Sequence, residues 1–79
     1  MSILIRLSPL IRKYVPDYDH STGIRLTLCE PLSVELIIAK LQIPREEVIS
    51  IVINGYPGKL NSTVNDGDSV MLAKVIGGG

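Results

Sequence analysis

The sequence ends with a run of three glycines, Gly77–Gly79, and these residues are its first candidates for chemistry. At a background of about 7% glycine, a given triplet is all glycine roughly three times in 10,000. Glycine loses more backbone freedom on folding than any other residue, so the run is a frayed end, a cloning remnant or a functional segment. A chain without Cβ atoms can enter a narrow channel, and residues 76–79, if extended, would reach about 13 Å at ~3.3 Å per residue. The run directly follows an expected strand, without a charged or Ser-rich linker, which favours the functional segment.

Other reactive residue types are present, but each lacks partners. Asp66 and Asp68 flank a glycine with no third ligand nearby, which makes a poor site for a hard cation and a good turn. Cys29 would need a base within reach to act as a nucleophile, and the one histidine, His20, is expected in an irregular loop. Cys29 is therefore interpreted as an incidental thiol, with a role in handling persulfide sulfur as the alternative. No metal site is predicted.

Composition excludes several classes of protein. The 79 residues suffice for one domain, and a hydrophobic content of 46% is ample for a core, which must be aliphatic because the sequence has no Trp and no Phe. Eight basic and eight acidic residues cancel, so nothing favours binding to nucleic acid or to a membrane surface. No apolar run is long enough to span a bilayer, and basic residues interrupt the N-terminal segment, unlike in a signal peptide. A single cysteine cannot form an internal disulfide, and a cytoplasmic location is expected.

Alternating apolar residues predict two strands in the first half of the chain. They cover Ser2–Ser8 and Ile24–Glu30. Between them we expect a short helical turn over Pro9–Tyr14 and then an irregular crossing that closes on Gly23. The side chains that should face the core are those of Ile3, Ile5, Leu7, Ile24, Leu26 and Leu28.

The clearest element is a helix over Ser33–Ile43. Its apolar residues recur at i, i+3, i+4 and i+7, which is one stripe of the 3.6-residue period. Ser33 can cap the free amide groups of the first turn. Pro44 should end the helix, because the residue before proline is pushed out of the helical region. The stripe consists of Val34, Ile37, Ile38 and Leu41.

The second half of the chain predicts further strands and their turns. Val48–Asn54 is β-branched and apolar on both faces, as expected of a central buried strand. A short strand near Lys59–Leu60 and a final strand over Ser69–Ile76 follow, with turns at "NGYPGK" and "NDGD". This order predicts a compact α+β domain over residues 1–76, with the helix covering one face of the sheet, and a flexible glycine tail over residues 77–79. The residues expected to be buried together are Ile5, Leu26, Ile37, Leu41, Ile51 and Leu72.

The final strand should also present a docking surface. If Val70 and Leu72 point to the core, then Met71, Ala73 and Val75 point outward beside the glycine run. An exposed apolar patch next to a reactive terminus is a natural place for a partner to bind. Alternatively, the outward side chains pack under the irregular loop or against Val48 and Val52 of the preceding strand.

Several segments together resemble the MoaD/ThiS family of sulfur-carrier proteins, which have the ubiquitin-like β-grasp fold. The resemblance covers nearly the whole chain, and its specific parts are the "INGYPG" turn, the turn at Asp66–Asp68 and the terminal Gly78 and Gly79. The stretch "PLIRKYVPDYD" is similar to an insertion of MoaD-like members and is longer than the ThiS-like loop. The resemblance therefore implies a mixed four- to five-stranded sheet on one main helix, closer to the MoaD-like branch. The chain departs from the family at Ala73 and Lys74, where an aromatic residue or proline is common.

The resemblance implies a carrier that has no catalytic side chains and is not an enzyme. In the family, a ubiquitin-activating-type enzyme uses ATP and magnesium to adenylate the terminal glycine, here Gly79. A sulfur donor then displaces AMP and leaves a C-terminal thiocarboxylate. Gly77 and Gly78 would thread the tail into that enzyme, and the carrier itself would bind no cofactor.

The MoaD-like length of the chain and its MoaD-like insertion favour one destination for the sulfur, the dithiolene of a molybdenum or tungsten pterin cofactor. The chain would then be the small subunit beside a larger synthase subunit. Sulfur delivery for thiamin thiazole, for tRNA thiolation or for an amino acid is the nearest alternative. A ubiquitin-like modifier that forms isopeptide bonds and an interaction module with an idle tail are two others. The sequence does not separate carrier from modifier.

Overall fold

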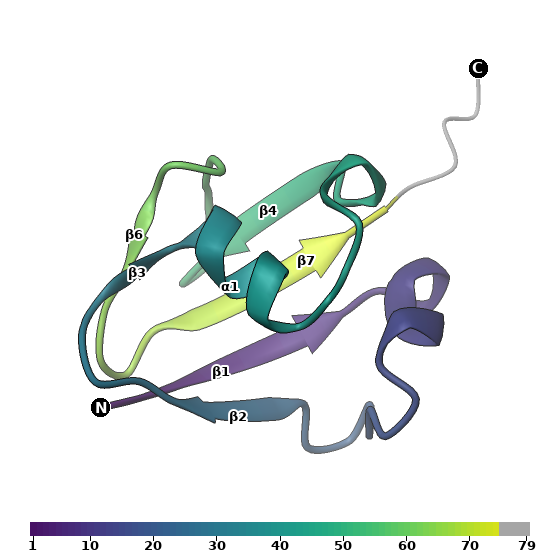
Figure 1. The fold of residues 1–79 in the computed structure, drawn as a ribbon, viewed down its shortest axis with the longest axis horizontal. Helices are drawn as coiled ribbons and strands as arrows, with labels where there is room; N and C mark the ends of the chain where they lie inside the picture. Colours follow the sequence, from purple (N-terminus) through teal and green to yellow (C-terminus); the bar gives the residue numbers. More distant parts are fainter. Residues whose placement is uncertain (75–79) are drawn as a thin grey trace.

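A computed structural model describes residues 1–74, which form a five-stranded mixed sheet with one α-helix across one face (Figure 1). The expected flexible tail, residues 77–79, lies outside the described residues. None of the helices within residues 1–74 has the length and apolar character needed to cross a membrane. The elements in chain order are β1 (Ser2–Leu7), the 3₁₀ helix η1 (Pro9–Tyr14), β2 (Ile24–Thr27), β3 (Leu32–Ser33), α1 (Val34–Lys40), the 3₁₀ helix η2 (Arg45–Glu47), β4 (Ser50–Ile53), β5 (Tyr56–Pro57), β6 (Thr63–Val64) and β7 (Ser69–Ala73).

The first and last long strands lie side by side within the sheet. Its order is β2-β1-β7-β4-β5, with β1 and β7 parallel and the other neighbours antiparallel. The short strands β3 and β6 pair separately beside the start of α1 (Figure 1). β7 is therefore the central strand and is held from both sides.

The alternation predicted for the first strand is confirmed. Ile3, Ile5 and Leu7 are buried, while the residues between them are half-buried. The register pairs Ile3 with Leu26 and Ile5 with Ile24, so the inward side chains of β1 and β2 share one face. η1 covers Pro9–Tyr14 as predicted.

The second strand is shorter than the predicted Ile24–Glu30. It ends at Thr27, although the amide of Leu28 still donates a hydrogen bond to the carbonyl of Met1 beside it. Leu28 is nevertheless buried and Cys29 exposed, as the alternation predicted.

The helix begins where predicted but ends earlier. Ser33 caps it, its Oγ accepting a hydrogen bond from the amide of Leu36 at 3.2 Å. The last helical residue is Lys40, so the prediction that Pro44 ends the helix is wrong. The chain leaves the helix at Gln42, which has a left-handed backbone with φ of 59°.

A Schellman motif produces this early end. The amide of Ile43 bonds the carbonyl of Ile38, and the amide of Gln42 bonds that of Ala39. Ile43 and Ile38 are both buried, which supplies the hydrophobic contact typical of this motif. Local capping geometry therefore ends the helix before proline can.

Replacing Gln42 by glycine should raise the free energy of unfolding by about 0.5–1 kcal/mol. A left-handed backbone costs a residue with a Cβ atom about 1–2 kcal/mol, and the larger entropy loss of glycine cancels part of that gain. Gln42 is exposed, so no packing is lost. Urea unfolding would measure the change. The matched control, Ala39→Gly at an exposed position inside the helix, should lose about 1 kcal/mol, and a destabilised Gln42→Gly would contradict the explanation.

The strands after the helix differ from the prediction in position. β4 is half-buried and lies between β7 and the short edge strand β5, so it is not the central strand. Asn54 and Gly55 have φ of 53° and 85°, which gives a tight two-residue hairpin. This turn starts the returning strand at once, at Tyr56–Pro57, and the strand expected at Lys59–Leu60 is absent from the described residues. Thr63–Val64 pairs instead with β3.

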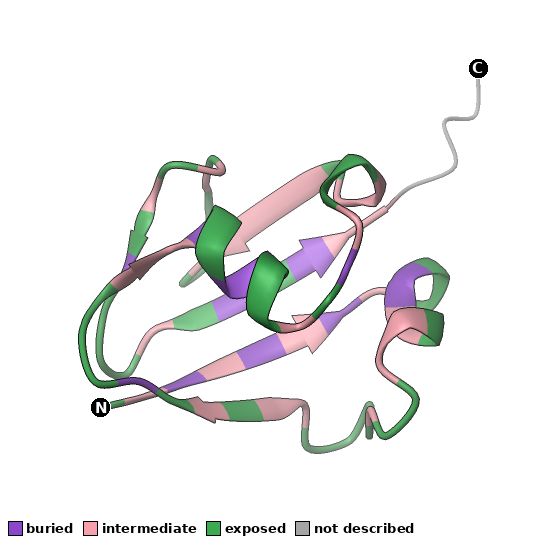
Figure 2. Cartoon of the chain, in the orientation of Figure 1, coloured by how far each residue is buried: buried purple, intermediate pink, exposed green. Residues whose placement is uncertain are grey.

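The core between α1 and the sheet is aliphatic, as the composition predicted. Figure 2 shows buried segments, in purple, on β1 and β7. Three of the six residues expected in it, Leu26, Leu41 and Ile51, are only half-buried and pack against its rim. Leu26 is on an edge strand, and Leu41 stands at the end of the shortened helix. The buried side chains of the core are those of Ile3, Ile5, Leu7, Ile11, Leu28, Val34, Ile37, Ile38, Ile43, Val64, Val70 and Leu72.

Candidate functional site

The candidate site is the end of β7, from which the glycine run follows in the sequence. The predicted reacting residue Gly79, the threading residues Gly77 and Gly78, and Val75 of the docking set lie outside the described residues. The structure does describe Lys74, the residue directly after β7. Because β7 is the central strand, hydrogen bonds from both of its neighbours reach to this end.

Two of the three predicted docking residues lie on the face of the sheet opposite α1. Met71 is 39% exposed, and Ala73 is half-buried. The register places Arg6 on one side of Met71 and Val52 on the other. The alternative of contact with the preceding strand thus holds in part, because Met71 lies beside Val52 and still remains exposed. Their role in docking stays a prediction.

The open face, as we name this side of the sheet, combines an apolar centre with basic residues. Its apolar members include Leu4, Val52 and Met71, which the strand registers place on one side. Among the strand residues described on this face, the charged ones are Arg6 and Arg25. Sequence reasoning missed Arg6, although the two-residue alternation of its strand could have placed it on this face.

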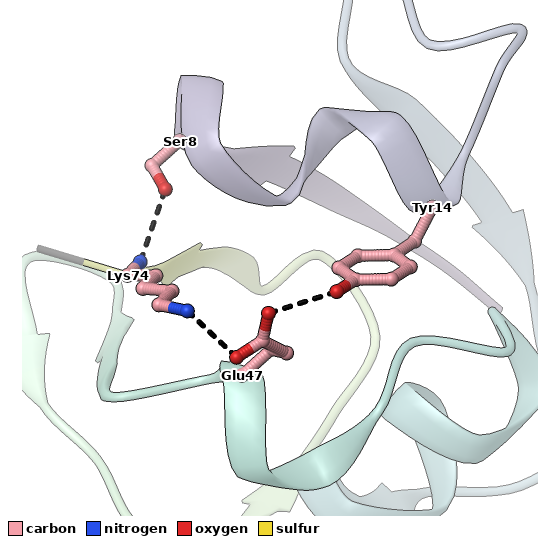
Figure 3. A network of polar contacts seen from close by, with 4 residues as sticks. All are labelled: Ser8, Tyr14, Glu47 and Lys74. Carbon is pink, nitrogen blue, oxygen red and sulfur yellow. Dashed lines mark hydrogen bonds and ion pairs between the residues drawn. The ribbon is translucent and has the colours of Figure 1, made fainter.

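Four residues form a polar network at the end of β7, which we call the Glu47 network: Ser8, Tyr14, Glu47 and Lys74 (Figure 3). Lys74 Nζ lies 2.7 Å from Glu47 Oε2, and the Tyr14 hydroxyl donates to Glu47 Oε1 at 2.8 Å. The backbone amide of Lys74 donates to Ser8 Oγ at 3.0 Å. The network joins the segments around η1, η2 and β7, and nothing in the sequence pattern singled it out.

The network also sets the protonation of its members. The hydrogen bond from Lys74, followed by that from Tyr14, lowers the pKa of the Glu47 carboxyl below its ordinary value. The same contact with Glu47 raises the pKa of the Tyr14 phenol. At neutral pH Glu47 is therefore an anion that accepts two hydrogen bonds, one on each oxygen.

Asp66 and Asp68 serve the turn, as interpreted from the sequence. Asp66 Oδ1 accepts the amide of Ser2 at 2.9 Å. Asp68 accepts the amide of Asn65 at 2.8 Å and the side-chain amide of Asn54 at 2.9 Å, and these bonds lower the pKa of its carboxyl. No group of three or more metal-ligating His, Cys, Asp or Glu residues occurs within residues 1–74.

Cys29 and His20 do not form a pair. Both are exposed, and they flank β2, an extended strand, so they lie toward its opposite ends. The backbone carbonyl of His20 accepts a hydrogen bond from Arg6 at 3.3 Å. The structure therefore supplies no base for the Cys29 thiol from this histidine.

Comparisons with known proteins agree on the fold. The family model described as Mut7-C ubiquitin matches residues 1–75, and no curated protein matches the sequence. The crystal structure of SAMP1 from Haloferax volcanii superposes with a TM-score of 0.69 over 100% of both chains, at 13% identity. The solution structure of a thiamine biosynthesis protein from Geobacter metallireducens gives 0.53 at 20% identity, over 96% of this chain and 87% of that one. The expected likeness to ubiquitin-like proteins is confirmed at the level of the β-grasp fold.

Proposed function

The chain belongs to the Mut7-C ubiquitin family, and from this premise we propose that it is a ubiquitin-like carrier of activated sulfur. Its working group is the carboxyl of Gly79. An activating enzyme transfers AMP from ATP to this carboxylate and releases pyrophosphate. A sulfur donor then displaces AMP, which leaves a thiocarboxylate. The observation that carries the proposal is a β-grasp fold whose central strand, β7, runs directly toward a glycine run in the sequence.

The division of labour follows from the chemistry of the carboxylate. A carboxylate is a poor electrophile until one oxygen becomes a good leaving group, and the partner enzyme supplies this with ATP and magnesium. The carrier supplies a rigid folded domain and a tail that is long and narrow enough to place its carboxyl in the enzyme. Gly77 and Gly78 lack Cβ atoms and can therefore thread a narrow channel. The partner enzyme supplies the catalytic groups, and no side chain of the carrier takes part in catalysis.

For the destination of the sulfur we propose the pterin dithiolene, with a larger synthase subunit as the second partner. The support is the long segment between β1 and β2, which includes η1 and matches the MoaD-like insertion in the sequence. Delivery to thiamin is the second candidate, favoured by the fold shared with a thiamine biosynthesis protein.

Intact-mass spectrometry of the protein purified from its native host tests the proposal directly. We expect a fraction whose mass corresponds to a chain ending at Gly79 with one carboxyl oxygen replaced by sulfur. Alkylation of the thiocarboxylate should shift this fraction alone. A chain found only attached to lysines of other proteins would favour the modifier, and a chain that continues past Gly79 would overturn the proposal.

Charge placed in the centre of the open face should weaken docking to the activating enzyme. Met71→Asp and Ala73→Asp should each raise KM for the carrier about tenfold or more, because a carboxylate is poorly solvated in an apolar contact. Steady-state pyrophosphate release would measure this. The matched control is Leu36→Asp on the exposed face of α1, where the wild-type side chain is 54% exposed and KM should not change. An unchanged KM in both sheet variants would place docking elsewhere.

A further inference from the structure

The main-chain hydrogen bonds between β7 and its neighbours stop at Ala73, before Lys74. Its last residue pairs are Leu7 with Leu72 on one side and Ser50 with Ala73 on the other. The amide of Ile49 still bonds the carbonyl of Ala73 at 2.9 Å. The contacts described for Lys74 itself are then made with side chains, through the Glu47 network.

Glu47 joins the two segments that lie beside this end. It is the last residue of η2, and its carboxylate binds Lys74 with one oxygen and Tyr14, the last residue of η1, with the other. Ser8, directly before η1, accepts the backbone amide of Lys74. Both ends of η1 are thus connected to the start of the tail (Figure 3).

The network is better suited to setting geometry than to adding stability. The side chains of Lys74 and Glu47 are 34% and 23% exposed, and ion pairs that water reaches contribute little to the stability of a fold. Charge-assisted hydrogen bonds are nevertheless short and directional. Lys74 makes two hydrogen bonds, one from its backbone amide to Ser8 and a charge-assisted one from its side chain to Glu47, and together they fix the direction of the backbone there.

Direction at Lys74 has a large effect at the reacting group. When the partner's narrow channel holds the tail extended, residues 75–79 span about 16 Å, and a tilt of about 10° at Lys74 then displaces the terminal carboxyl by about 3 Å. A misplacement of about 1 Å can slow a reaction about 100-fold. We propose that Glu47 is a positioning residue for the reaction at Gly79: by joining Tyr14 and Lys74, it sets the direction in which the chain leaves β7. This inference rests on the proposed function.

Steady-state adenylation of the full chain by its activating enzyme tests the inference. We expect Glu47→Gln to lower kcat about tenfold while KM stays within about twofold, because docking through the open face is untouched. Glu46→Gln is the matched control, since it removes the same charge from the adjacent, exposed residue, whose side chain makes no hydrogen bond within residues 1–74. It should leave both constants unchanged.

Exchanging the charges provides a rescue. Glu47→Lys and Lys74→Glu should each lower kcat, and the double variant should recover most of it, because the ion pair re-forms and the Tyr14 hydroxyl can accept as well as donate. Tyr14→Phe, which leaves the ion pair in place, should give a smaller loss. A double variant no better than either single one would overturn the inference.

Hydrogen exchange at the Lys74 amide supplies a readout that does not depend on catalysis. Exchange should accelerate in Glu47→Gln, while that of Ile5 in the core stays unchanged, which shows that the fold is intact. If the wild-type chain is not adenylated, the proposed function fails and this inference fails with it. If the wild type reacts and Glu47→Gln matches it in kcat, this inference alone is overturned.

Discussion

Adding one alanine after Gly79, or deleting Gly79, should abolish ATP-dependent thiocarboxylation by the activating enzyme. Either change moves the carboxyl by one residue, about 3.3 Å, when a misplacement of about 1 Å can cost about 100-fold in rate. We expect at least a 100-fold loss, measured as thiocarboxylate formed in single-turnover mass spectra. The buried core lies between Ile3 and Leu72, so the melting temperature should stay within error of the wild type.

Replacing Gly78 by valine tests whether the narrow shape of the tail matters, without changing the position of its carboxyl. Gly78→Val keeps the carboxyl in place but adds a branched side chain where the channel is narrow. Adenylation should slow strongly, while binding measured by competition with the wild-type carrier should change little. Normal sulfur transfer by the chain extended with alanine would show that Gly79 is not the reacting group.

Replacing Ile37 by alanine should produce the largest loss of stability. Ile37 is fully buried between α1 and the sheet, and large-to-small changes at such sites cost about 2–5 kcal/mol. The whole domain should be stable by only about 4–12 kcal/mol, at roughly 0.05–0.15 kcal/mol per residue. The melting temperature should therefore fall by about 8 °C or more, as measured by calorimetry and urea unfolding.

The neighbouring leucine provides the matched control. Leu36 is in the same helix and is 54% exposed, so Leu36→Ala should cost less than about 0.5 kcal/mol. Leu41→Ala should fall between the two, because Leu41 is half-buried at the end of the helix rather than in the core. A cost for Leu41 equal to that for Ile37 would mean that the buried face of α1 is wrongly assigned.

Local patterns in the sequence determined most of the secondary structure. The alternation around Ile3 and Ile5, the cap at Ser33 and the turn at Asn54–Gly55 each depend on residues within a few positions, and the structure has all three. The glycine run was likewise visible as composition alone. Such features can be predicted because sterics and neighbouring hydrogen bonds decide them.

Only the tertiary structure decided which strands meet and what surrounds the end of β7. The helix ended early because Ile43 could pack back on Ile38, and β7 became central because it pairs with β1 and β4. The Glu47 network joins residues 27, 33 and 66 positions apart. A two- or 3.6-residue period tells which side chains face inward but does not specify the partner element. Partners so distant meet only once the sheet order and its register are set, so Glu47 could not be distinguished from Glu46 in the sequence.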